Sequence, residues 1–146
     1  MGEKAAIARD VYESWNSRDF DRGAQAMADG GEIVIVGSGE RFAGPEGAVA
    51  YSRKWADAFP DGRIEIDHLT EGDSTVVVEF TGRGTHTGTL VTPMGDLPAT
   101  DRRVELHLCD VLEFEGDKIK NQRSYIDSGA IMQQLGLMPE PQATTA

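Results

Sequence analysis

Hydrophobic residues near the N-terminus recur at the spacing of a helix. Ile7, Val11 and Trp15 are four residues apart, and Ala8 and Tyr12 lie beside them on the same helical face. One apolar stripe on an otherwise polar segment is typical of a helix that packs against a core. The pattern predicts a first helix of about fifteen residues.

Two more helices are expected before the strands begin. The first is short, carries Phe20 and Met27, and ends at the Gly30-Gly31 pair. The second begins near Pro45, because proline is favoured in the first turn of a helix, and it ends at Pro60. Its buried face is marked by Tyr51, Trp55 and Phe59.

Strand-like segments dominate the rest of the chain, with glycine-containing turns between them. We expect strands over residues 32–36, 63–68, 75–87, 104–114 and 119–127, an excursion over 88–102, and a hairpin turn at 115–118. Ser128 is expected to cap a last short helix that ends at Gly136.

Helices followed by a run of antiparallel strands predict an α+β fold, in which the helices pack on one face of a curved sheet. We expect a single cone-shaped domain over residues 1–138 around an apolar pocket, followed by a loose tail over 139–146.

Alternation along the strands indicates which side chains face the pocket. His86 falls on the same face as Val78 and Phe80. Asp110 is the only charged residue in an apolar row that contains Leu108 and Leu112. Both polar side chains are therefore expected to point into the pocket.

The last strand is less regular. Lys118, Lys120, Gln122 and Ser124 are polar, so the other face, with Arg123, Tyr125 and Asp127, is expected to be the inner one. Three titratable groups, His86, Asp110 and Asp127, would then converge. Burial raises the pKa of a carboxyl group and makes it a usable acid or base near neutral pH, and Arg123 or Tyr125 would stabilise an oxyanion.

The net charge of −11 disfavours binding to nucleic acids and to anionic membranes, and the sequence has no Lys/Arg-rich stripe. Cys109 is the only cysteine, and no apolar segment resembles a signal peptide or a membrane span. These features predict a soluble, cytoplasmic protein. No metal site is expected, since the chain lacks clustered cysteines and closely spaced histidine pairs.

Short segments between residues 5 and 138 resemble, in order, those of the SnoaL-like polyketide cyclases, a family within the NTF2-like superfamily. They are Trp15-Asn16, Phe59-Pro60-Asp61, Glu71-Gly72-Asp73, Gly84-Thr85-His86-Thr87-Gly88, Pro98-Ala99-Thr100, Gly116-Asp117-Lys118-Ile119, Tyr125-Ile126-Asp127 and Gln134-Leu135-Gly136. The chain departs from many members in having Gln122-Arg123 where they have His-Trp.

The resemblance implies an α+β barrel that needs no cofactor and assembles as a homodimer or homotetramer. It also implies ring closure of a polyketide-like substrate by intramolecular aldol condensation, with Asp127 as the acid/base and either His86 or Asp110 assisting. We expect the substrate to be small and apolar, and to contact Trp15, Tyr51, Phe80, Leu108, Arg123 and Tyr125.

Each candidate also has a structural interpretation. Asp127 lies just before a helix, where its charge would stabilise the helix N-terminus. Asp110 would pair with Arg123 across the hairpin, and His86 would be a buried histidine with satisfied hydrogen bonds. Three other functions also remain: an epoxide hydrolase that activates water with Asp110 and Asp127, an isomerase-like enzyme of the same fold, and a binding module without catalysis.

Overall fold

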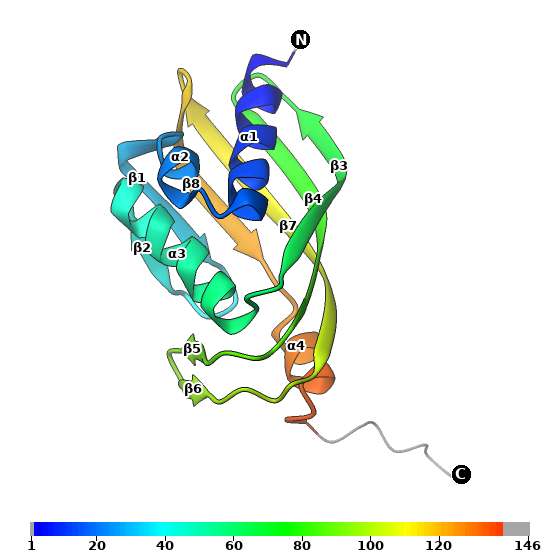
Figure 1. The fold of residues 1–146 in the computed structure, drawn as a ribbon. Coiled ribbons are helices and arrows are strands. Elements are labelled where there is room, and N and C mark those ends of the chain that lie inside the picture. Colours follow the sequence, from blue (N-terminus) through cyan, green and yellow to red (C-terminus); the bar gives the residue numbers. More distant parts are fainter. Residues whose placement is uncertain (1, 139–146) are drawn as a thin grey trace, which may run out of the picture.

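The computed structural model describes residues 2–138, so the tail expected over 139–146 lies outside the described residues. Four helices form: α1 (Glu3–Ser17), α2 (Phe20–Ala24), α3 (Gly44–Ala58) and α4 (Ser128–Gln134) (Figure 1). The predicted first and third helices are confirmed, with Pro45 in the first turn of α3. None of the helices in the described part of the chain is long and apolar enough to cross a membrane.

Six strands form one sheet in the order β2-β1-β8-β7-β4-β3. Their bounds are β1 (Met27–Ile35), β2 (Arg41–Ala43), β3 (Arg63–Glu71), β4 (Thr75–Thr85), β7 (Arg103–Glu115) and β8 (Lys118–Tyr125). A separate antiparallel hairpin consists of β5 (Leu90–Thr92) and β6 (Gly95–Leu97).

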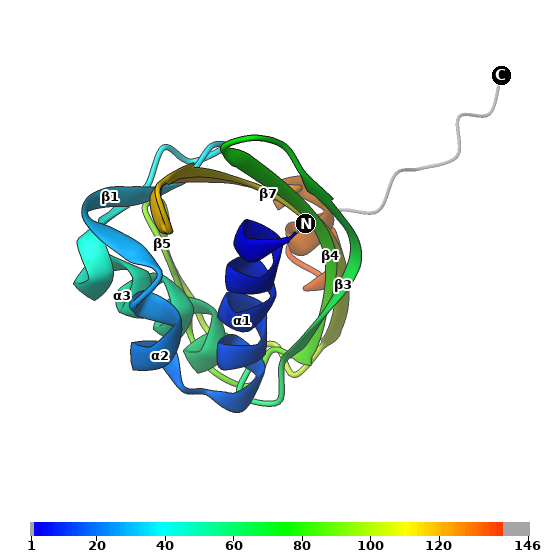
Figure 2. The ribbon, with the colours of Figure 1, turned by 90° about the horizontal axis from the view of Figure 1, so that it is seen from above.

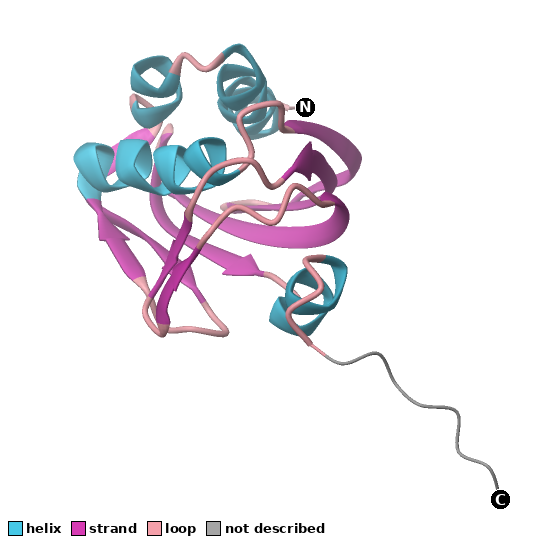
Figure 3. Cartoon of the chain, turned by 60° about the horizontal axis from the view of Figure 1, so that its bottom comes forward, coloured by secondary structure: helices cyan, strands magenta, loops and turns pink. Residues whose placement is uncertain are grey.

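The sheet is strongly curved, and it wraps around α1 when the molecule is viewed from above (Figure 2). Helices α1, α2 and α3 lie together on its concave side, whereas α4 lies apart from them (Figure 3). This arrangement confirms the predicted α+β fold with helices on one face of a curved sheet.

Two local predictions were wrong, and the one for the excursion was incomplete. Met27 and the Gly30-Gly31 pair belong to β1, because the second helix already ends at Ala24. The excursion over residues 88–102 contains the β5–β6 hairpin. The strands are not all antiparallel, since β1 runs parallel to β8.

Two apolar clusters hold the helices to the sheet. The larger one joins α1 to the sheet, with Tyr12 packed on Phe80 at a ring-centroid distance of 5.1 Å. The smaller one lies where α3 ends and joins Phe59 to Leu90 of β5, to Leu106 of β7 and to Leu135 beyond α4. The second cluster therefore joins the end of α3 and the β5–β6 hairpin to the sheet and to α4.

Strand β8 contains a bulge that decides which of its side chains face the helices. Ile119 pairs with Phe114, but Asn121 pairs with Glu113, so Lys120 has no partner in the register. An extra residue in one strand reverses the alternation beyond it. Ile119, Gln122 and Ser124 are consequently the buried residues of this strand.

The parallel neighbour β1 also bulges here, between Met27 and Glu32. A Cβ atom on Gly31 would lie 2.7 Å from the carbonyl oxygen of Ile119, too close for any side chain. A Cβ atom on the adjacent Gly30 would have nothing within 4 Å. Glycine at position 31 therefore permits the close approach of β1 to the bulged segment of β8.

We predict that Gly31→Ala lowers the free energy of unfolding by about 2 kcal/mol or more, because backbone atoms must move to admit the methyl group. Gly30→Ala is the matched control and should change the free energy of unfolding by less than about 1 kcal/mol. Urea unfolding of both variants measures the difference. Equal stability of the two variants would show that β1 and β8 are not held this closely.

Candidate active site

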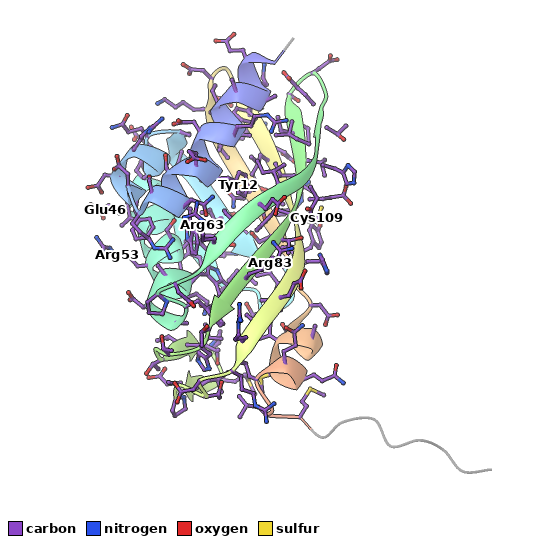
Figure 4. The ribbon with its side chains drawn as sticks, turned by 45° about the vertical axis from the view of Figure 1, so that its right-hand side comes forward. Tyr12, Glu46, Arg53, Arg63, Arg83 and Cys109 are labelled. Carbon is purple, nitrogen blue, oxygen red and sulfur yellow. The ribbon has the colours of Figure 1, made fainter. Side chains whose placement is uncertain are left out.

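A cavity of about 130 Å³ lies between the helices and the concave face of the sheet. Most of its lining is apolar, and its principal residues come from α1, α3, β4, β7 and β8. Among them are Val11, Tyr12, Trp15, Tyr51, Trp55, Phe59, Phe80, Leu106, Leu108, Asp110, Ile119 and Gln122. Figure 4 shows Tyr12 between α1 and the sheet, and Cys109, the neighbour of Asp110, on the outer side.

Asp110 of β7 is 2 % exposed and is the only carboxylate among the residues that line this cavity. The hydroxyl of Tyr12 donates to its Oδ2 atom at 2.5 Å, and the amide of Gln122 donates to the same atom at 3.3 Å. The hydroxyl of Ser124 donates to Oδ1 at 2.7 Å. The carboxylate is thus held from both sides by neutral donors, and no cationic side chain of residues 2–138 forms an ion pair with it.

This environment changes the acidity of Asp110. Burial disfavours the charged carboxylate and raises its pKa to about 6, while the hydrogen bonds from Tyr12 and Ser124 oppose the increase. Burial and the adjacent carboxylate raise the pKa of Tyr12. Asp110 therefore exchanges its proton near neutral pH, whereas Tyr12 remains a hydrogen-bond donor.

Five of the predicted site residues are brought together at the cavity. Asp110 lies among its polar groups, and Trp15, Tyr51, Phe80 and Leu108 form part of its wall. The alternation of β4 and β7 was correctly predicted, so Phe80, Leu108 and Asp110 share the concave face. Asp110 is not paired with Arg123, contrary to the structural interpretation considered for it.

The predicted orientation of Arg123, Tyr125 and Asp127 was wrong, because the bulge in β8 turns them to the outer side. Arg123 forms an ion pair with Glu113, and Tyr125 is 45 % exposed. Asp127 is exposed, and its Oδ1 atom accepts a hydrogen bond from the backbone amide of Ala130 at 3.0 Å. Asp127, rather than Ser128, is the N-cap of α4.

His86 also lies outside the cavity, although it is fully buried. Its Nδ1 atom accepts a hydrogen bond from the backbone amide of Thr100 at 3.2 Å, and its ring packs on Phe59. Burial lowers the pKa of His86, which favours the neutral ring. The expectation that His86 faces the pocket was wrong. The structural interpretation holds only in part, because the ring is buried but its Nε2 atom has no hydrogen-bond partner among the described residues.

Three polar residues of the site, Tyr12, Gln122 and Ser124, were not among the predicted catalytic or binding residues. Tyr12 carried a signal, since its hydroxyl interrupts the apolar stripe of the first helix. Strict alternation assigns Gln122 and Ser124 to solvent. The family resemblance did mark position 122, since Gln122 stands where many members have histidine.

A family model described as SnoaL-like polyketide cyclase matches residues 5–135. The chain belongs to the SnoaL-like polyketide cyclase family. No curated protein matches this SnoaL-like protein in sequence.

Solved structures share its fold at low sequence identity. A candidate SnoaL-like polyketide cyclase from Jannaschia sp. CCS1 is 18% identical with a TM-score of 0.82, over 94% of each chain. TsrD from Streptomyces laurentii is 21% identical with a TM-score of 0.79, over 93% of this chain and 96% of its own. An LEH-like epoxide hydrolase from M. tuberculosis is 19% identical with a TM-score of 0.68, over 91% of this chain and 89% of its own. These likenesses establish the NTF2-like fold of this SnoaL-like protein.

The polar groups at the cavity of this SnoaL-like protein are hydrogen-bond donors and one carboxylate. Within residues 2–138, no group of three or more His, Cys, Asp or Glu side chains is arranged to hold a metal ion. A buried carboxyl group with a raised pKa can accept or release a proton near neutral pH, and Asp110 is such a group.

We predict that Asp110→Asn changes stability in a pH-dependent way. The folded state holds the Asp110 proton more tightly than the unfolded chain does. The contribution of Asp110 to the free energy of unfolding of the wild type therefore decreases as the pH rises from 3.8 to about 6. Asparagine does not titrate. The variant should therefore gain about 2 kcal/mol relative to wild type between pH 4 and pH 8.

Urea unfolding of both proteins at several pH values measures this gain, and the titration of all other groups cancels in the difference. A difference in unfolding free energy that stays constant over the whole range would show that Asp110 keeps an ordinary pKa.

Proposed function

We propose that the protein is a cofactor-independent enzyme that closes a ring in a small apolar molecule by intramolecular aldol reaction. Ionised Asp110 removes a proton from a carbon next to a carbonyl group, and the resulting enolate attacks a second carbonyl group of the same molecule. The observation that carries the proposal is a buried carboxylate, with a pKa of about 6, at a mostly apolar cavity.

The environment of Asp110 suits a general base. A desolvated carboxylate with a raised pKa is a better proton acceptor than one in water, yet it is still ionised at pH 7. Three neutral donors fix its orientation without supplying a positive charge that would weaken its basicity. The apolar wall excludes water, which would otherwise compete for the enolate.

The size of the cavity limits the part of the substrate that reacts. Its volume of about 130 Å³ is close to that of an engineered cavity of about 150 Å³ that takes up benzene. The described conformation therefore admits about one ring, or a chain folded to the size of one ring. Enclosing both carbonyl groups in such a space favours intramolecular attack.

Family membership supports ring closure, since the family is described as polyketide cyclases. Epoxide hydrolysis by two carboxylates is less well supported, although a fold relative is described as an LEH-like epoxide hydrolase. That mechanism requires both Asp110 and Asp127 at the cavity, but Asp127 caps α4 on the outer side. Asp110 alone remains at the cavity.

We predict that the wild-type protein accelerates deuterium exchange at the α-carbons of heptane-2,6-dione in D₂O and closes this diketone to a six-membered ring. Asp110→Asn should lower both rates by about 100-fold or more, because the base is lost while the shape of the cavity is kept. Proton NMR follows both reactions in one sample.

Asp127→Asn is the matched control. It removes the same charge, and asparagine preserves the cap of α4, so both rates should stay close to wild type. Loss of activity in this variant but not in Asp110→Asn would reverse the assignment. Binding of the diketone without exchange or closure in the wild type would indicate a binding module.

The pH dependence provides a separate prediction. Because the ionised form of Asp110 is the base, kcat/KM for exchange should rise with pH and level off above about 6. Tyr12→Phe removes a donor to the charged form and should shift this rise to higher pH. A profile that is identical in wild type and Tyr12→Phe would contradict the assignment.

A further inference from the structure

A chain of hydroxyl groups connects Asp110 to a second point on the cavity wall. The hydroxyl oxygen of Ser124 lies 2.7 Å from Oδ1 of Asp110 and 2.9 Å from the hydroxyl oxygen of Tyr51. Ser124 is fully buried and does not line the cavity, whereas Tyr51 does. The two ends of the chain therefore reach the cavity from β7 and from α3, and its middle is inaccessible.

The direction of these hydrogen bonds follows from the number of protons. Ser124 has one hydroxyl proton and donates it to the ionised Asp110, so its oxygen accepts from Tyr51. If Asp110 is protonated on Oδ1, it becomes the donor and both bonds reverse. Tyr51 then accepts from Ser124, and its own proton is released toward the cavity.

We propose that Tyr51 is the acid that protonates the substrate oxygen, and that Ser124 carries the proton to it from Asp110. This inference rests on the proposed ring closure. Asp110 takes a proton from the α-carbon, the enolate forms the new C–C bond, and the attacked carbonyl oxygen becomes an alkoxide. Tyr51 gives its proton to the alkoxide, Ser124 reprotonates Tyr51, and Asp110 reprotonates Ser124.

The steps balance without a proton from solvent. One proton leaves carbon and one arrives at oxygen, and Asp110 is again ionised at the end. Because the cavity is mostly apolar, an internal route of this kind would replace the water that normally supplies such a proton.

The surroundings of Tyr51 suit this role. Edge-to-face contacts with Phe42 and Trp55, at centroid distances of 5.4 and 6.5 Å, hold its ring on the cavity wall. Burial raises the pKa of Tyr51, so its hydroxyl stays protonated until a strong base such as an alkoxide forms. Tyr12 is placed differently, since its hydroxyl donates directly to Oδ2 of Asp110.

The test separates the two halves of the reaction of heptane-2,6-dione. Deuterium exchange at carbon requires only the base, whereas ring closure also requires protonation of oxygen. Tyr51→Phe and Ser124→Ala should each slow closure by about 10-fold or more, yet leave exchange at saturating pH within about 3-fold of wild type. The double variant should be no slower than the worse single variant, because the two groups act in one chain.

Tyr125→Phe is the matched control, since it removes the same hydroxyl from the exposed side of the sheet and should change neither rate. Closure at the wild-type rate in Tyr51→Phe overturns the relay. An equal loss of exchange and closure also overturns it, because Tyr51 would then act on the enolate. Tyr51→Phe alone decides the matter if Ser124→Ala does not fold.

Failure of the proposed function gives a different result. In that case Asp110→Asn exchanges deuterium as fast as wild type, whatever the Tyr51 and Ser124 variants do. If exchange depends on Asp110 but the rate of ring closure is unchanged in the Tyr51 and Ser124 variants, the proton relay is wrong and the proposed function still stands.

Discussion

A carboxylate buried in an apolar space is the constraint on which the site depends. A charged group removed from water must find hydrogen-bond donors or give up its charge. Asp110 combines the two responses. Tyr12, Gln122 and Ser124 donate hydrogen bonds to its carboxylate, and burial raises its pKa to about 6, so that it gives up its charge more readily. A cationic partner would have stabilised the charge further and made the carboxylate a weak base.

The donors come from elements that the fold must bring together. Tyr12 belongs to α1, whose apolar stripe packs on the concave face of the sheet. Ser124 and Gln122 belong to β8 and reach Asp110 only because of the bulge at Lys120. Gly31 permits β1 to approach that bulge. The arrangement of the active site therefore depends on a local irregularity of the sheet as much as on the helices above it.

Much of this could be predicted from periodicity. The four-residue spacing of Ile7, Val11 and Trp15 predicts α1, and the regular strands β4 and β7 place Phe80 and Asp110 on the concave face. Asp127 shows where such reasoning fails. Strict alternation carries through β8 only if no residue is inserted, and the bulge left no mark among the polar residues 120–124 that alternation could detect.

¹³C NMR can establish whether the Asp110 carboxyl group titrates near neutral pH inside the folded protein. The carboxyl carbon of Asp110 is assigned by comparison with Asp110→Asn, and its chemical shift is followed from pH 3 to pH 9. The account predicts a midpoint of about 6. A midpoint at the ordinary value of 3.8 would contradict it, because such a carboxylate would be neither desolvated nor an effective base.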